Sequence, residues 1–200
     1  MWLEVYMSGF EFVLVLYAVI AGLAISELVT GFADQISARH RMAFYPLQIL
    51  LSIFLLYASV VFLWTLWMFR AMDWSFQLYL LIMLYPLIIA LCSRLVRIDY
   101  SAGAMPVKDQ YFSNAAPTYI ALALIPTIVV VLSFTSLREI VEDPPDLAYV
   151  TPFRVLAILG FLFLAWSKNE TAHKIGLLAL NIFVVIISSR LSVDAIGGAT

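Results

Sequence analysis

Long, nearly uncharged apolar runs limit what this chain of 200 residues can fold into. A helix needs about 20 mostly apolar residues to cross the hydrocarbon core of a bilayer. The sequence therefore predicts an all-α fold, a polytopic bundle of six transmembrane helices that forms a single domain. The six apolar runs cover residues 10–31, 46–69, 76–96, 118–137, 150–167 and 174–190.

The composition indicates that a lipid bilayer, rather than water, surrounds most of the chain. Hydrophobic residues make up 64% of the sequence and charged residues 12%, with a mean hydropathy of +1.01. Soluble domains carry about 25% charged residues. The net charge is −2 and there is no run of Lys and Arg, so nucleic-acid binding is not expected. The single cysteine, Cys92, excludes an intramolecular disulfide.

Two segments depart from a simple series of spans. The fifth apolar run, Phe153 to Trp166, reaches a full span only by recruiting Tyr149 to Thr151 or by local thinning of the bilayer. A re-entrant fifth segment is the main alternative to six spans. The polar stretch from Arg97 to Pro117 is expected to be a link that lies on the membrane surface or against a partner.

The charges between the apolar runs predict the orientation in the membrane. The links after the first, third and fifth runs hold seven Lys and Arg residues, and the opposite side holds four. Lys and Arg remain on the cytoplasmic side during insertion. We therefore expect a cell (cytoplasmic) membrane protein with both termini outside. The first residues carry Glu4 and Glu11 rather than a positive stretch, which favours a retained first helix over a cleaved signal.

A weak internal similarity relates the two halves of the chain. A displacement of 96 residues aligns residues 60–97 with 156–193 and places Ser93-Arg94-Leu95 over Ser189-Arg190-Leu191. A repeat unit of three spans would be inverted in its second copy, giving the 3+3 inverted repeat of several transporter folds. Chance similarity between leucine-rich helices is the alternative.

Glu27 lies inside the first apolar run, where an ionisable group often belongs to an ion or proton pathway. A structural ion pair is the alternative. Glu27 lies 17 residues after Phe10 in the first span, and Arg94 lies 18 residues after Phe76 in the third. Both spans run in the same direction, so the two side chains reach a similar depth. We expect Glu27 to pair with Arg94, or with Arg97 one turn further on.

Small residues recur every four positions in the first span, at Ala18, Gly22, Ser26 and Thr30. Such a stripe allows close helix approach in lipid and predicts that this span packs inside the bundle. Ser26 and Thr30 are, with Glu27, candidates for the lining of a transport pathway. Asn181, near the middle of the sixth span, is a further candidate, and a hydrogen bond to a neighbouring helix is its alternative role.

Prolines and the remaining basic groups give weaker indications. Pro86 and Pro126 lie in mid-span and are expected to kink their helices, which can frame a cavity. Arg190, at the outer end of the sixth span, is expected to pair with an acidic group, either Glu11, Asp73 or Glu139. His40 and His173 fall on expected links without a second ligand at metal-binding spacing, so neither a metal nor a cofactor is predicted.

The first half of the chain resembles an uncharacterised family of small bacterial multi-pass membrane proteins. The resemblance covers roughly residues 10–120. It implies a bacterial cytoplasmic membrane and carries no known activity. The link after the first span, QISARHR, has fewer arginines than that family leads us to expect. The segments that carry the resemblance are AVIAGLAISELVTGFADQISARHR, LWTLWMF, RAMDWSF and DQYFSN.

These features favour a small transporter or channel for an ion or solute, with Glu27 as its buried polar group. The alternative is a non-transporting subunit or sensor that binds another membrane protein. No catalytic motif is present, and an enzyme is not expected. The small size and the small-residue stripe favour a homo-oligomer, a dimer or larger.

Overall fold

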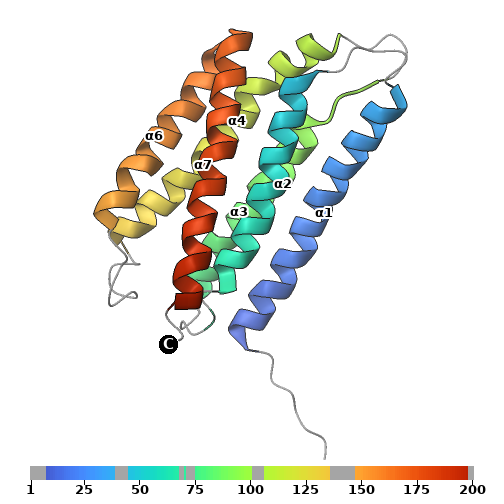
Figure 1. The fold of residues 1–200 in the computed structure, drawn as a ribbon. Coiled ribbons are helices and arrows are strands. Elements are labelled where there is room, and N and C mark those ends of the chain that lie inside the picture. Colours follow the sequence, from blue (N-terminus) through green and yellow to red (C-terminus); the bar gives the residue numbers. More distant parts are fainter. Residues whose placement is uncertain are drawn as a thin grey trace, which may run out of the picture.

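The computed structural model describes residues 8–38, 45–67, 70, 75–100, 106–135 and 147–197. Within these ranges the chain forms six helices, which run alternately in opposite directions, so the first residue of α1 and the last of α7 lie at the same end of the bundle (Figure 1). The all-α fold class is confirmed. The helices are α1 (Gly9–Ala38), α2 (Pro46–Leu66), α3 (Phe76–Val96), α4 (Val107–Thr135), α6 (Leu147–Trp166) and α7 (Glu170–Gly197).

Four of these helices are long and apolar enough to cross a membrane. They comprise Gly9–Ala38 in α1, Pro46–Trp64 in α2, Phe76–Val96 in α3 and Val107–Val131 in α4. A shorter apolar segment, Pro152–Trp166, lies in α6. By length and composition, the described part of the chain is that of a multi-pass membrane protein.

The fourth helix begins 11 residues before Thr118, at Val107, and continues through Pro117. Residues 107–117 are therefore helical, although their polarity led us to expect a link. The first turn forms because the amides of Asp109 and Gln110 donate to the carbonyl of Pro106, at 2.9 and 3.0 Å. The helix is then held by one apolar face, since the buried residues recur every four positions, at Val107, Tyr111, Ala115 and Tyr119.

Helix α1 begins with a reciprocal cap. The Ser8 amide donates to Glu11 Oε2 at 2.7 Å, and the Glu11 amide donates to Ser8 Oγ at 3.2 Å. This capping box satisfies two donors that the first helical turn leaves without partners. Glu11 therefore caps the N-terminus of its own helix. The side chain of Arg190, together with Asp73 and Glu139, lies outside the described residues.

The small-residue stripe of α1 does not face the bundle. Ala18, Gly22 and Ser26 are exposed, and the buried stripe of the same helix includes Val13, Tyr17, Ala21, Ala24 and Leu28. The prediction for this face was wrong because a larger side chain decides the packing. Tyr17 stacks on Phe62 with ring centroids 5.4 Å apart and donates to the carbonyl of Ser59 at 3.0 Å. Helix α1 thus lies at the edge of the bundle, against α2 and α3 (Figure 1).

The main core lies between all six helices, and α1 contributes Ala24 and Leu28 to it. Leu55 of α2, Ile89 and Cys92 of α3, and Leu122 of α4 are almost completely buried there. Since lipid tails are as apolar as leucine, this core is stabilised by close packing rather than by exclusion of water. Stacked rings extend it toward α1, where Phe62 and Tyr85 lie 3.7 Å apart between centroids.

Gly176 of α7 lies in close contact with Leu164 of α6. A Cβ atom there would lie 3.0 and 3.1 Å from the terminal carbons of Leu164, which is only 2% exposed. A Cβ at Gly160 of α6 would meet nothing within 4 Å. We expect Gly176→Leu to lower the free energy of unfolding by about 1–3 kcal/mol through overpacking. Gly160→Leu, the matched control, is expected to change it by less than about 0.5 kcal/mol or to raise it.

Both variants can be compared by unfolding in mixed micelles, with Cys92 as the reporter. It is the single cysteine of the chain and is fully buried, so its reaction with a thiol-reactive dye follows unfolding. Equal losses for the two glycines would contradict the tight contact at Gly176.

Candidate functional site

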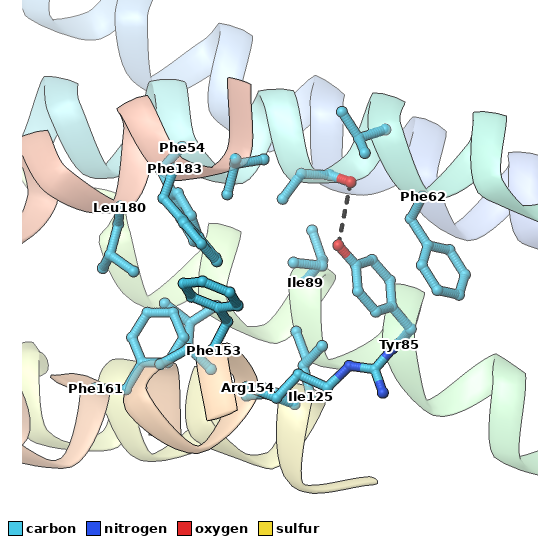
Figure 2. A pocket seen from close by; sticks show the side chains of 16 residues that line it. Phe54, Phe62, Tyr85, Ile89, Ile125, Phe153, Arg154, Phe161, Leu180 and Phe183 are labelled. Atoms are coloured by element: carbon cyan, nitrogen blue, oxygen red, sulfur yellow. Dashed lines mark hydrogen bonds between the residues drawn. The ribbon is translucent and has the colours of Figure 1, made fainter. Parts of the chain in front are cut away.

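A cavity of about 290 Å³ lies inside the bundle, between α2, α3, α4, α6 and α7 (Figure 2). Its wall is mostly aromatic and aliphatic. Pro126 of α4 lies in this wall. Helices α3 and α4 continue through Pro86 and Pro126, and the kinks themselves stay a prediction. The cavity is lined by Phe54, Ala58, Val61, Phe62, Tyr85, Ile89, Leu122, Ile125, Pro126, Phe153, Arg154, Ala157, Phe161, Leu180, Phe183 and Val184.

Arg154 is the one charged residue among the described residues that line this cavity. It lies in the second turn of α6, two residues after Pro152. In Figure 2 its guanidinium lies beside the ring of Tyr85, whereas Phe153, Phe161 and Phe183 gather toward the other end. The Tyr85 hydroxyl donates to the carbonyl of Ala58 at 3.1 Å. The cavity therefore has a guanidinium group on one side and an apolar wall on the other.

A second hollow, a groove of about 500 Å³, lies between α6 and α7. It shares Phe153, Ala157, Leu180 and Phe183 with the wall of the cavity. The rings of Phe153 and Phe183 lie 5.9 Å apart between centroids. From the contact at Gly176 the two helices diverge toward the opposite end of the bundle (Figure 1). These two rings thus belong to a wall common to the groove and the cavity.

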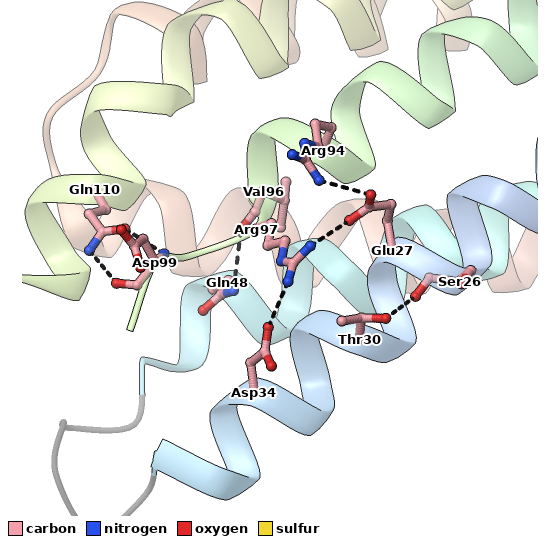
Figure 3. A network of polar contacts seen from close by, with 10 residues as sticks. All are labelled: Ser26, Glu27, Thr30, Asp34, Gln48, Arg94, Val96, Arg97, Asp99 and Gln110. Carbon is pink, nitrogen blue, oxygen red and sulfur yellow. Dashed lines mark hydrogen bonds and ion pairs between the residues drawn. The ribbon is translucent and has the colours of Figure 1, made fainter. Parts of the chain in front are cut away.

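Glu27 of α1 is held by Arg94 of α3 and by Arg97, which directly follows that helix (Figure 3). Arg94 Nη1 lies 2.9 Å from Glu27 Oε1, and Arg97 Nη1 lies 3.2 Å from Glu27 Oε2. Arg97 also reaches Asp34, with 3.2 Å between Nη2 and Oδ2. The contact between Glu27 and Arg94, which their similar depth in the membrane predicts, is present. Both arginines take part, where the sequence left the choice between them open.

The partners of the other pathway candidates lie within the bundle. Thr30 Oγ1 donates to the carbonyl of Ser26 at 2.8 Å, inside α1. Asn181 Nδ2 donates to the carbonyls of Leu50 and Leu177, at 3.2 and 2.8 Å, and so joins α7 to α2. This is the helix-joining role weighed for Asn181 from the sequence. None of these residues lines the central cavity.

A buried chain of hydrogen bonds joins α4 to α7. The hydroxyl groups of Tyr111 and Tyr119 are 2.8 Å apart, and the Tyr111 hydroxyl lies 2.9 Å from His173 Nδ1. His173 Nε2 lies 2.9 Å from the carbonyl of Ser167, which only accepts, so Nε2 carries a proton. Burial lowers the pKa of His173, which favours the neutral ring. Tyr111 therefore donates to Nδ1 and accepts from Tyr119.

Tyr45 completes this cluster at the edge. Its ring packs edge-on against Tyr111, with centroids 5.4 Å apart. Its hydroxyl is buried and makes no hydrogen bond within the part of the chain that the structure describes. Burial, together with the negative charge of Glu170, raises the pKa of Tyr45 to about 12. Tyr45 therefore remains a neutral phenol under ordinary conditions.

Sequence reasoning missed this cluster and the role of Arg154. His173 was assigned to a link, yet it is completely buried. The available signal was the spacing of Tyr111 and Tyr119, which are eight residues apart and so share a helix face. Arg154 counted only as one of the four basic residues on the outer side, although it lies two residues after Pro152, inside the fifth apolar run.

Glu170 of α7 is held by two lysines. Lys108 of α4 and Lys174 each place Nζ 2.8 Å from one of its carboxylate oxygens. These contacts lower the pKa of Glu170 from 4.5 to about 2. A lowered carboxyl pKa stabilises the fold above the unfolded value, and this contribution disappears as the pH falls through the folded value.

We therefore expect wild type to unfold at higher denaturant than Glu170→Gln at neutral pH. This difference should shrink from about pH 4.5 downward and vanish near pH 2. Labelling of Cys92 after denaturant unfolding at a series of pH values measures this difference in stability. Acidic samples are returned to neutral pH for the labelling step. A difference that persists unchanged to pH 2 would contradict the proposed contacts.

Comparison with family models, with curated proteins and with solved structures found no match. The described residues contain no group of three or more His, Cys, Asp or Glu side chains that is arranged to hold a metal ion. The function therefore has to be argued from the cavity and the polar contacts themselves.

Proposed function

We propose that this chain is a six-span protein of the bacterial cytoplasmic membrane that carries a small solute, with both termini outside. Helices α6 and α7 contain 20 and 28 residues, and about 20 residues reach across the hydrocarbon core of a bilayer. The alternating directions of the helices and the shared end of α1 and α7 support an even number of crossings. The proposal also includes membership of an uncharacterised bacterial family and a 3+3 inverted repeat.

The central cavity is the observation that carries the proposal. Five helices line it, and Pro126, which lies inside the continuous helix α4, is part of its wall. Ligand sites of helical bundles are commonly formed between the helices. Glu27 is assigned a different role, because Arg94 and Arg97 both contact its carboxylate. We propose that it clamps α1 to α3.

Flux from proteoliposomes tests the carrier function. The experiment loads vesicles with labelled carboxylates, amines and sugars and compares their efflux with that from protein-free vesicles. Ala157→Trp fills the cavity and is expected to abolish efflux. Ala18→Trp, on the exposed face of α1, is the control and is expected to retain it. Efflux of no solute in the series would contradict a carrier.

A non-transporting subunit is the second candidate function. The observation in its favour is that Glu27, Thr30 and Asn181 all make their polar contacts inside the bundle. This candidate predicts no efflux and a stoichiometric complex with one membrane protein in mild detergent. The homo-oligomer remains a proposal, and the mass of the purified protein in detergent tests it.

A further inference from the structure

We infer that the central cavity binds a single-chain amphipathic anion, a medium-chain carboxylate, with its head group at Arg154. This inference deepens the proposed carrier function by naming the class of solute. It follows from the charge, the shape and the access of the cavity.

Arg154 selects for negative charge. It is the one charged residue among the described residues of the wall. A guanidinium carries five N–H donors in a planar fork that matches a carboxylate, and such charge-assisted hydrogen bonds are stronger than neutral ones. The apolar surroundings strengthen the attraction further, because little water screens it.

The rest of the cavity suits a hydrocarbon chain. Phe153, Phe161 and Phe183 lie on the side away from the guanidinium (Figure 2), and Leu180 and Val184 extend the same wall. Ligand cavities in proteins generally begin at about 300 Å³. The observed volume of about 290 Å³ accommodates one short chain rather than the two long chains of a phospholipid.

The groove between α6 and α7 supplies a route from the bilayer. It has an apolar lining and shares four wall residues with the cavity, including Phe153 and Phe183. An amphiphile that is already dissolved in the membrane reaches this groove without passing through water. Movement of these two rings, whose centroids are 5.9 Å apart, would open the common wall.

Competition binding to the protein in nanodiscs tests the inference. Labelled decanoate is displaced by unlabelled decanoate, decanol or acetate. Decanoate should compete at a concentration about tenfold or more below that of decanol, and acetate should not compete. Arg154→Gln should weaken decanoate binding by about tenfold or more and remove the preference over decanol. Arg154→Lys should retain a preference for the anion.

Two further variants separate ligand binding from folding. Lys168→Gln removes an exposed positive charge outside the cavity and should leave decanoate binding unchanged. Ala157→Phe leaves Arg154 in place but occupies the cavity, and should block decanoate and decanol alike. Protection of Cys92 from thiol labelling establishes that each variant is folded.

Equal competition by decanol and decanoate in wild type, or an unchanged preference in Arg154→Gln, would overturn the inference. Arg154-dependent binding of decanoate without any efflux from proteoliposomes would support the inference and refute the carrier function. Efflux of a neutral or cationic solute without decanoate binding would support the carrier function and refute the inference.

Discussion

Replacing Glu27 with glutamine is expected to lower the free energy of unfolding by about 2 kcal/mol, through loss of its two ion pairs. The change leaves Arg94 and Arg97 with Asp34 as the remaining carboxylate of this network. Breaking a fully buried ion pair costs about 3–5 kcal/mol. The expected loss is smaller because the Arg94 side chain is 66% exposed and that of Glu27 is 32% exposed. Unfolding in mixed micelles, followed by Cys92 labelling, measures it.

A double-mutant cycle measures the coupling free energy between Glu27 and Arg94. Glu27→Gln and Arg94→Gln should be coupled by more than about 0.5 kcal/mol, as expected for groups in direct contact. Asp109→Asn, at an exposed carboxylate early in α4, is the control and should change stability by less than about 0.5 kcal/mol. A Glu27→Gln protein that is as stable as the control but lacks efflux would restore the pathway role that the sequence suggested.

Tyr111→Phe is expected to cost more than Tyr119→Phe, although each change removes one oxygen atom. The Tyr111 hydroxyl is the middle member of the chain, 2.9 Å from His173 Nδ1 and 2.8 Å from the Tyr119 hydroxyl. Its loss leaves two buried polar groups without a partner, at about 1–3 kcal/mol each, so the total is about 2–6 kcal/mol. Tyr119→Phe removes a terminal donor and should cost about 1 kcal/mol.

Two measurements check this difference. Unfolding with Cys92 as the reporter compares the stabilities of the two variants. Nitrogen NMR of the His173 ring in wild type should show a proton on Nε2 and none on Nδ1, because Nε2 faces the Ser167 carbonyl. Equal costs for the two tyrosines, or a proton on Nδ1, would refute the direction assigned to the hydrogen bonds.

The features that were predicted correctly from the sequence depend on where a residue lies along one helix. The apolar runs marked where helices form, and the depth of Glu27 and Arg94 within their runs placed them in contact. The start of α4 was missed because the polar residues before Thr118 hide a buried face that includes Val107 and Tyr111. Polarity averaged over a segment does not reveal such a face.

Contacts between distant segments that no matched depth indicates could not be predicted from the sequence. Tyr111 and His173 are 62 residues apart, and no periodicity within either helix indicates that they meet. Arg154 has the sequence context of an interfacial residue. It lines a cavity in the structure because α6 packs extensively against α4. The prediction that the small-residue stripe of α1 faces the bundle was wrong for a related reason. The packing of the large Tyr17 side chain outweighs the spacing of the small residues.

The shared end of α1 and α7 allows two copies of the chain to be encoded in tandem. With the six crossings that we propose, a flexible linker from Gly197 to the next copy stays on one side of the membrane and adds no crossing. In such a concatemer, Arg154→Gln can be placed in one copy while the other is left intact. Half of the decanoate sites would remain if each copy acts alone, and a larger loss would reveal that the copies function as a unit.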